Sequence, residues 1–394
     1  MTKKPSYRFT GYTEVWEEKK LGNLGSVEMC RRIFKEETSA EFEIPFFKIG
    51  TFGGEADTYI TREKFEEYKT KFAYPQRGDL LLSASGSIGR VVEYDGDEAY
   101  YQDSNIVWLN HHGKINNKFL KAFYKIVSWS GIEGTTIKRL YNKNILETYI
   151  SLPSLPEQTA IGSFFQDIDQ LISLQQRKLE VLKEKKKTYL KLLFPAKGQT
   201  KPALRFAGFE DEWKEVKLGE VCSIKGGNAW KSEHYSTDGK YLVVTISNVK
   251  GNEYIDDTYG NRIDTVESQF ILEQGDILIS LTGNVGRVSK MTEVAAVLNQ
   301  RVGKLATNQS NNFLFTLLSN RNFEKEMVLS SQGAAQANIS NNDVLNYKTS
   351  FPSLPEQEAI GSFFQDLDKA IAKQEEKVNQ FKESKQTLLR KMFI

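Results

Sequence analysis

Two nearly identical segments occur in this chain of 394 residues, and their repetition limits the fold more than any other feature. PSLPEQTAIGSFFQDID begins at Pro153 and PSLPEQEAIGSFFQDLD begins at Pro352, and the two differ at only two positions. A period of about half the chain is far too long for a solenoid. The repetition therefore indicates a duplicated unit, and two copies on one chain are expected to lie about a pseudo-two-fold axis.

Two weaker repeats precede these segments in the same order. RFTGY and KLG, which ends at Gly22, correspond to RFAGF and KLG, which ends at Gly219. GDLLLSASGSIGR, from Gly78, corresponds to GDILISLTGNVGR, from Gly275. Each unit is thus a variable block followed by a near-identical segment, and we divide the chain into blocks 1–152 and 197–351 and helical segments 153–196 and 352–394.

Each near-identical segment begins a long predicted helix. Proline and glutamate suit its first turn, and apolar residues then recur in alternating steps of four and three, which is the seam of a coiled coil. The seam positions are Ile161, Phe165, Ile168, Ile172, Gln175, Leu179, Leu182, Lys186, Tyr189 and Leu193 in the first copy, and Ile360, Phe364, Leu367, Ile371, Gln374, Val378, Phe381, Lys385, Leu388 and Met392 in the second. The natural partner of each narrow stripe is the other copy, and a two-fold axis across the helices makes the pair antiparallel.

A helix of about 37 residues is roughly 55 Å long. Such a pair is expected to separate two globular blocks, and the matched glutamine and lysine positions to set its register. A plain scaffold or dimerisation helix is an alternative interpretation of the same pattern. The lysine run at 185–187 is a solvated helix end or, as a second reading, a nucleic-acid contact.

The variable blocks have the pattern of mixed α/β domains. Short β-rich runs bounded by glycine-containing turns predict strands at 44–49, 80–83, 89–94, 105–109, 241–246, 277–281, 286–290 and 301–305. Helices are predicted at 62–71, 118–128 and 312–329. Each block is long enough to bury a core of its own.

The paired GD…S…G..GR motif places a tight loop between two predicted strands. Glycine allows close approach of a ligand, short polar side chains surround the loop, and arginine offers a fork that suits phosphate or guanine. The candidate DNA contacts here are Ser83, Ser85, Ser87, Arg90, Thr282, Asn284 and Arg287. The alternative is a plain β-hairpin whose glycines serve only the turn.

Further candidates follow other predicted strands. Asn and Gln can pair with adenine, and Arg with guanine. These candidates are Lys48, Gln102, Ser104 and Asn105 in the first block, and Thr245, Ser247, Asn248, Asn299, Gln300 and Arg301 in the second. The polar loops 134–139 and 333–338 are either phosphate contacts or simple connections. A solvated loop residue is the competing interpretation of each position.

Composition favours binding over catalysis. The chain has 53 Lys+Arg against 51 Asp+Glu, with a formal net charge of +2, so charge alone neither supports nor excludes nucleic acid. Two cysteines and three histidines lack metal-ligand or disulfide spacing. No P-loop, H-E-x-x-H or G-x-S-x-G motif is present. We expect no catalytic and no metal site, a cytoplasmic location, and no membrane segment.

The layout resembles the specificity (S) subunit of Type I DNA restriction-modification systems over essentially the whole chain. The repeated PSLPEQ helix starts, the paired G-D-x-L-x-S-x-x-G-x-x-G-R motif and LNQRV at residues 298–302 carry the resemblance. The first block reads YQDSNIVWL at 101–109 where the second has LNQRV, and it departs from the pattern there.

The resemblance implies two target-recognition domains, one per variable block, separated by a long antiparallel two-helix coiled coil. Each domain would read one half of a bipartite double-stranded DNA site. The helices would set the spacer and bind two methyltransferase (M) subunits, and restriction (R) subunits could join. The chain itself would then be non-catalytic and hold no cofactor, because S-adenosylmethionine, ATP and Mg²⁺ would belong to the partner subunits.

Two interpretations from other classes remain open at this stage. One is a stand-alone pseudodimeric DNA-binding regulator that needs no methyltransferase partner. The other is a structural coiled-coil adaptor that binds no nucleic acid.

Overall fold

A computed structural model describes residues 5–129, 131, 138–196, 198–251, 253–331 and 337–393. The chain forms two compact units, and we describe each by itself. Unit 1 comprises Met1–Gln176 with Glu376–Ile394, and unit 2 comprises Arg177–Glu375. Each unit therefore combines one variable block with parts of both long helices.

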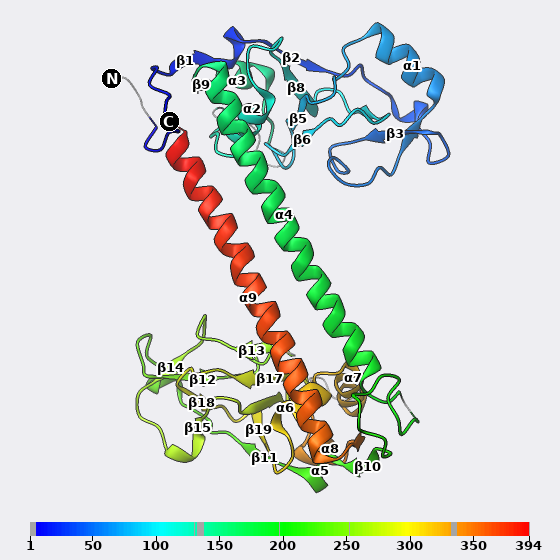
Figure 1. Cartoon of the computed structure of the whole chain (residues 1–394), viewed down its shortest axis with the longest axis vertical. Helices are drawn as coiled ribbons and strands as arrows, with labels where there is room; N and C mark the ends of the chain where they lie inside the picture. Colours follow the sequence, from blue (N-terminus) through cyan, green and yellow to red (C-terminus); the bar gives the residue numbers. More distant parts are fainter. Residues whose placement is uncertain are drawn as a thin grey trace. The chain divides into compact units, whose positions relative to one another are not determined.

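Unit 1 contains three small sheets (Figure 1). All strand pairs are antiparallel except β3–β7. In spatial order the sheets are β1 (Glu17–Lys20) and β9 (Tyr149–Leu152); β2 (Ser26–Met29), β8 (Ile106–Asn110), β5 (Leu80–Ser83) and β6 (Val91–Glu93); and β4 (Tyr59–Ile60), β3 (Ile44–Phe47) and β7 (Tyr100–Tyr101). Its short helices are η1 (Leu21–Asn23), η2 (Lys35–Glu37), α1 (Arg62–Lys71), α2 (Asn117–Tyr124) and α3 (Asn142–Glu147).

Unit 2 has the same plan with additional strands. Its sheets are β10 (Lys214–Lys217) and β20 (Lys348–Phe351); β11 (Cys222–Gly226), β19 (Val302–Thr307), β16 (Ile277–Ser280), β17 (Val288–Met291) and β13 (Glu253–Ile255); and β14 (Arg262–Ile263), β12 (Tyr241–Val244), β18 (Ala296–Leu298) and β15 (Ile271–Leu272). Its short helices are α5 (Leu218–Val221), η3 (Ser232–His234), η4 (Ser268–Phe270), α6 (Asn311–Leu318), α7 (Arg321–Ser330) and α8 (Asn341–Leu345).

The prediction of one helix over 312–329 is wrong, because the structure has two helices there. The Ser319 hydroxyl donates to the Phe315 carbonyl at 2.7 Å where α6 ends. Asn320 then caps α7 by accepting from the backbone N–H of Asn322 at 3.2 Å. Serine and asparagine compete with the helical hydrogen-bond ladder in this way, which favours a break and a new start.

The long helices α4 (Leu155–Leu192) and α9 (Leu354–Met392) confirm the predicted pairing within each unit. In unit 1, the Phe165 ring lies 6.1 Å from the Phe393 ring, and Lys385 pairs with Asp169. In unit 2, Lys186 pairs with Asp368 at 2.6 Å and Lys183 with Glu375 at 2.5 Å. Within each unit, later residues of α4 meet earlier residues of α9, so the segments run antiparallel. In the described part of the chain, no helix combines the length and apolarity needed to span a membrane.

The glutamate of the repeated PEQ motif forms a buried ion pair at the start of each long helix. The Glu157 carboxylate is fully buried and accepts two hydrogen bonds from the Arg8 guanidinium, at 2.6 and 2.7 Å. In unit 2, Arg205 donates to buried Glu356 in the same bidentate manner, at 2.7 and 2.7 Å. The arginine of each RF-x-G motif is thus a structural partner of the following helix, and burial makes the pair costly to break.

The glutamine of the same motif ties the long helix to its neighbour. Gln158 donates to the Pro153 carbonyl and accepts from the backbone N–H of Asn116, both at 2.9 Å. Asn116 in turn caps α2. Gln357 makes the corresponding bonds to Pro352 and Ser310 in unit 2. The near-identity of the two segments therefore has a structural cause.

The glycine of the IGSFF sequence permits close packing between the helices. A Cβ added to Gly162 would lie 2.6 Å from the backbone nitrogen of Phe119, at the start of α2. At Gly361 it would lie 2.7 Å from the backbone nitrogen of Phe313. Backbone atoms cannot move aside as a flexible side chain can, so only glycine fits at these two positions.

We predict that Gly162→Ala destabilises unit 1 by about 1–3 kcal/mol through overpacking, although alanine is the better helix former. Denaturant unfolding of the full chain, with hydrogen exchange followed separately in each unit, measures this. Gly361→Ala should move the loss of protection to unit 2. Gly50→Ala is the control because an added Cβ meets open space there. Unchanged or increased stability of Gly162→Ala would contradict the packing argument.

The two equivalent aspartates of the helix pairs differ in their electrostatics. Burial alone would raise the pKa of Asp169, but hydrogen bonds from Lys125 and Lys385 outweigh it and hold this pKa below its ordinary value. At Asp368 burial dominates over the attraction of Lys186, and the pKa is raised. Protonation of Asp169 therefore favours unfolding, whereas protonation of Asp368 favours the folded state.

We predict opposite acid responses for the two aspartates. The stabilisation from Asp169 is present above about pH 4, the ordinary aspartate range, and is lost as the pH falls further. Asp169→Asn should reduce the loss of folding stability at low pH. Asp368→Asn should increase that loss, because the stabilisation gained when Asp368 is protonated is removed. Thermal unfolding of both variants between pH 3 and pH 7 provides the comparison, and equal effects of the two substitutions would show that the environments do not differ.

Candidate nucleic-acid interface

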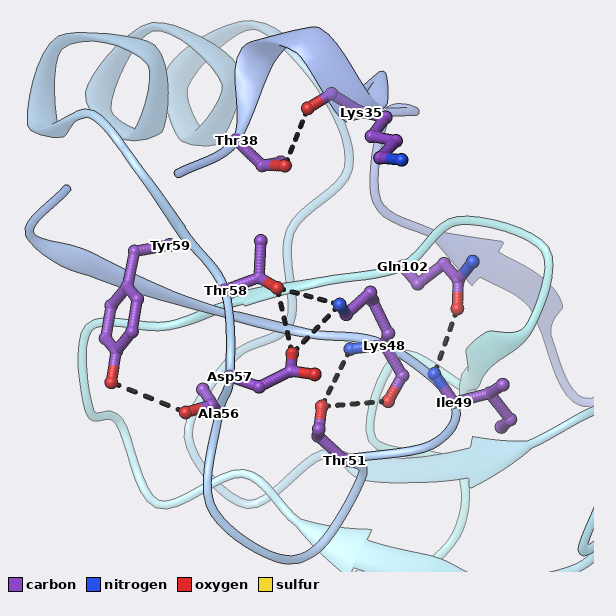
Figure 2. A network of polar contacts seen from close by, with 10 residues as sticks. All are labelled: Lys35, Thr38, Lys48, Ile49, Thr51, Ala56, Asp57, Thr58, Tyr59 and Gln102. Carbon is purple, nitrogen blue, oxygen red and sulfur yellow. Dashed lines mark hydrogen bonds and ion pairs between the residues drawn. The ribbon is translucent and has the colours of Figure 1, made fainter. Parts of the chain in front are cut away.

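The turn after β3 holds Lys48 at the centre of a polar network (Figure 2). The Lys48 ammonium donates to the Thr58 hydroxyl at 2.7 Å and pairs with the Asp57 carboxylate at 2.9 Å. The Lys48 backbone N–H donates to the Thr51 hydroxyl at 3.1 Å, which closes the turn. The hydrogen bond from Lys48 is the largest cause of the lowered pKa of Asp57. Lys48 is thus half-buried and held in place by these contacts, and the Asp57 carboxylate balances part of its charge.

Gln102 connects this turn to the segment between β7 and β8. Its side-chain oxygen accepts from the backbone N–H of Ile49 at 2.9 Å (Figure 2). The backbone N–H of Gln102 donates to the Phe47 carbonyl at 2.9 Å. The side-chain nitrogen is not used in either contact. Gln102 therefore holds two loops together and retains a donor group.

Ser104, Asn105 and Ser85 meet beside Gln102. The Ser85 hydroxyl donates to the Asn105 side-chain oxygen at 2.8 Å, and Arg139 donates to the Ser104 hydroxyl at 2.7 Å. Ser85 and Arg139 also form an isolated β-bridge. Arg139 ends the predicted polar loop 134–139, whose residues 134–137 lie outside the described residues.

These groups line an open cleft of about 580 Å³ in unit 1, which we call the first-block cleft. Four cationic side chains line it, Arg32, Lys35, Lys48 and Arg139, against the single carboxylate of Asp103. The remaining lining residues are Ile33, Phe34, Thr38, Phe46, Thr58, Gln102, Ser104 and Asn105. The cleft thus combines excess positive charge with amide and hydroxyl groups, as a nucleic-acid surface requires.

The hairpin motif of unit 1 is mainly structural. Ser83 is buried, and its hydroxyl donates to the Ser87 carbonyl at 2.5 Å and accepts from the Arg90 N–H at 2.9 Å. The Arg90 guanidinium donates to the Phe52 carbonyl at 2.6 Å. β5 and β6 form an antiparallel hairpin here, and Gly86 and Gly89 have positive φ. Ser83 and Arg90 therefore shape the loop that carries Ser85 and Ser87.

Unit 2 repeats the turn with different side chains. The Thr245 N–H donates to the Asn248 side-chain oxygen at 3.0 Å, and the Thr245 and Ser247 hydroxyls lie 2.7 Å apart. Asn248 is buried and donates to the Tyr259 carbonyl at 3.1 Å. Asn248 therefore takes the place of Thr51, while Thr245 takes the place of Lys48 and carries no charge.

The hairpin of unit 2 also has internal bonds. The Ser280 hydroxyl donates to the Asn284 carbonyl, and Arg287 donates to Glu324 at 3.1 Å. The Thr282 hydroxyl is buried and has no hydrogen-bond partner among the described residues. Thr282 forms a β-bridge with Asn338, at the end of loop 333–338, whose residues 333–336 lie outside the described part.

Asn299, Gln300 and Arg301 form the turn between β18 and β19. The Asn299 side chain accepts from the Arg301 N–H at 3.2 Å, and its own N–H donates to the Val244 carbonyl at 3.2 Å. The Gln300 and Arg301 side chains are exposed. The structure thus brings this turn next to the turn at Thr245 and presents an arginine and a glutamine to solvent.

Sequence reasoning missed Arg32, Lys35, Phe34 and Thr58. Arg32 and Lys35 flank Phe34, whose ring is 53% exposed, and the Arg32 guanidinium lies 5.5 Å from its centre. Basic residues interleaved with an aromatic residue are a usable signal for nucleic-acid contact. Thr58 carries no such signal, because its place beside Lys48 depends on the path of the intervening loop.

Comparisons with known proteins agree with this layout. The family model "Type I restriction modification DNA specificity domain" matches residues 13–184 and 210–382. A putative type I restriction enzyme specificity subunit of Haemophilus influenzae is 51% identical over 152 residues, which are 38% of this chain and 40% of that protein. The MjaVIII specificity subunit of Methanocaldococcus jannaschii is 27% identical over 79% of this chain and 74% of its own length.

Solved structures support the fold. The chain resembles the S subunit of a Type I restriction-modification system from M. genitalium, with a TM-score of 0.66 and 18% identity over 100% of this chain and 99% of that chain. A chain from work on complex assembly and conformational transition of the type I R-M system gives a TM-score of 0.54 at 18% identity, with 98% of both chains covered. Because the family model matches both halves over well more than half of the chain, this protein belongs to the family of Type I restriction-modification DNA specificity proteins.

Proposed function

We propose that this chain is the sequence-recognition subunit of a Type I restriction-modification complex and that each variable block binds one half of a bipartite DNA site. One observation carries the proposal. Both units carry three equivalent loops: the turn after β3 or β12, the hairpin loop after β5 or β16, and the segment before β8 or β19. The side chains on these loops differ between the two units. A duplicated frame with diverged loops is what recognition of two different half-sites requires.

In the first block, the proposed contacts lie in the first-block cleft. Lys48 and Arg139 supply charge for phosphate oxygens, and Gln102, Ser104 and Asn105 supply groups suited to base edges. Ser87 lies exposed on the adjoining hairpin loop, whereas Ser85 is buried there and positions Asn105. Ser83 and Arg90 support the site by holding that loop, since their polar groups already have internal partners.

In the second block, Gln300 and Arg301 are the proposed base contacts because they are exposed on a turn that Asn299 holds. Thr245, Ser247 and Asn284 lie on neighbouring loops and complete the surface, whereas the Thr282 hydroxyl is buried beneath it. Asn248 and Arg287 are engaged inside unit 2 and act by positioning these loops.

The remaining assignments follow from family membership. Residues 1–152 and 197–351 would be the target-recognition domains. The helices at 153–196 and 352–394 would set the spacer and bind two methyltransferase subunits, with restriction subunits completing the assembly. Catalysis, together with S-adenosylmethionine, ATP and Mg²⁺, would reside on those partners.

We predict that Arg301→Ala, in the assembled complex, weakens binding to the cognate duplex by about 1–3 kcal/mol and relaxes sequence preference in one half-site only. Lys48→Ala should instead reduce affinity across sequences and lower the salt dependence of binding. Titration of duplexes with single base changes, at two salt concentrations, separates the two effects. Lys143→Ala is the matched control because Lys143 is highly exposed on α3 and lies outside the cleft.

We further predict that exchange of residues 1–152 for another first block changes one half of the methylated motif and leaves the other half unchanged. Methylome sequencing of cells that carry each version, or neither, provides the measurement. If deletion of the gene abolished no bipartite motif, the subunit function would be wrong. Tight operator binding by the purified chain, without methyltransferase, would favour the regulator instead.

A further inference from the structure

The outer edge of one sheet differs between the two units. In unit 2, β13 pairs in parallel with the outer side of β17. In unit 1, β6 occupies the position of β17, and no strand of the described residues pairs with its outer side. The same edge is therefore covered in one unit and open in the other.

A difference in loop length explains this asymmetry. The connection from β12 to β14 spans residues 245–261, whereas the connection from β3 to β4 spans only residues 48–58. In unit 1, two successive turns bring Gly53 against Val92, and the chain then returns to β4. The shorter loop has no residues left to form a strand beside β6.

Burial and hydrogen bonding agree that the β6 edge is open. All residues of β17 are buried, whereas Val91 and Val92 are half-buried and Glu93 is exposed. The Tyr94 N–H donates to Asp79 and the Tyr94 carbonyl accepts from Gly78, at 2.8 and 2.7 Å. Because alternate residues of a strand face opposite neighbours, the backbone N–H and C=O of Glu93 point to the open side.

A groove of about 270 Å³ adjoins this edge, between α2 and α4, and we call it the β6 groove. It is lined by Glu93, Lys118, Lys121, Ala122, Lys125, Gly162, Phe165, Gln166, Asp169, Gln170 and Ser173. Lys121 pairs with Glu93 at 2.8 Å and Lys125 with Asp169 at 2.7 Å, while Lys118 is exposed. Three ammonium groups thus face two carboxylates.

Unit 2 shows what covers the equivalent edge. The Tyr254 ring of β13 lies 5.9 Å from the Phe315 ring of α6. Lys290, at the position of Glu93, is 5% exposed and donates to Asn312. The covering segment is acidic, since Glu253, Asp256 and Asp257 surround Tyr254 and Ile255. A strand with an aromatic side chain is therefore the occupant of this edge in unit 2. In unit 1, lysines on and directly after α2 stand where unit 2 has Asn312, Phe315 and Ser319, and they would favour acidic residues in an occupant.

We propose that the β6 groove binds an extended acidic segment of another protein chain, which adds in parallel to β6 and inserts an aromatic side chain between α2 and α4. Main-chain hydrogen bonds to Glu93 would supply affinity, and the lysines of α2 would select acidic sequences. The open edge of β6 favours a peptide over DNA. A peptide would use both the backbone groups of this edge and the lysines, whereas DNA phosphates would use the lysines alone. The binding does not depend on DNA recognition by the loops.

The probe is a fluorescent peptide with the sequence of residues 250–258, KGNEYIDDT, titrated into the full chain and followed by anisotropy. We expect salt-sensitive binding that a scrambled peptide does not reproduce. Lys118→Glu with Lys121→Glu should weaken it by about 10-fold or more through charge repulsion. Lys114→Glu with Lys143→Glu is the matched control, because both lysines are exposed and lie outside the groove.

Glu93→Pro tests the strand edge directly, because it removes the outward N–H and spares the bonds to β5. It should abolish peptide binding, and hydrogen exchange of unit 1 checks that the variant is folded. As a second variant, replacement of residues 48–58 by 245–261 should cover the edge from within and also abolish binding.

Three outcomes would overturn the proposal. One is absence of peptide binding up to millimolar concentration, and another is unchanged binding by folded Glu93→Pro. The third is that the lysine reversals weaken binding of a random DNA duplex but not of the peptide, which would assign the lysines to phosphate. None of these outcomes bears on half-site recognition, which the methylated motif tests separately.

Discussion

Each unit depends on a helix end that comes from a distant part of the sequence. In unit 1, Leu389, Met392 and Phe393 of the α9 end join the core formed by residues 16–165, and the Phe393 ring stacks on Phe119 at 5.1 Å. In unit 2, Phe194 follows α4 and stacks on Phe313 at 5.7 Å. A variable block therefore completes its core only when the antiparallel helix segments are in register. This requirement limits substitution at the helix positions that pack into the two cores.

The same constraint explains why the chain can hold two different recognition surfaces. Several side chains are the same in both halves and are engaged in internal bonds or contacts. They are the paired arginine and glutamate, the glutamine that follows, the close-packed glycine and the hairpin serine. The side chains that the loops carry differ: Lys48 is replaced by Thr245, and the turn with Ser104 and Asn105 by one with Gln300 and Arg301. Because the frame carries the stability, the loops are free to diverge.

Sequence reasoning identified the elements whose pattern is local and repeated. The hairpin strands, α1 and the long helices follow from periodicity and glycine spacing. The break at Ser319–Asn320 was missed because polar residues in the middle of an apolar pattern cap a helix only when the local geometry allows it. The first-block cleft was only partly anticipated, since Arg32 and Lys35 reach it from a segment without regular periodicity. The additional strand β13 has no counterpart in the first half, so no repeat marks it.

Near-identity of sequence does not make the two helix segments equivalent in electrostatic terms. Asp169 and Asp368 occupy matching positions and each has a lysine partner from the other helix, yet their pKa values shift in opposite directions. The cause lies in the variable blocks. Lys125, directly after α2, pairs with Asp169, whereas unit 2 has Ser319 near the corresponding end of α6, and burial of Asp368 there outweighs the attraction of Lys186 and Lys290. A partner that binds the two repeated segments therefore meets two surfaces with the same backbone but different charge. Any preference between the two repeated segments must originate in the blocks beside them or in the two positions at which they differ, Thr159/Glu358 and Ile168/Leu367.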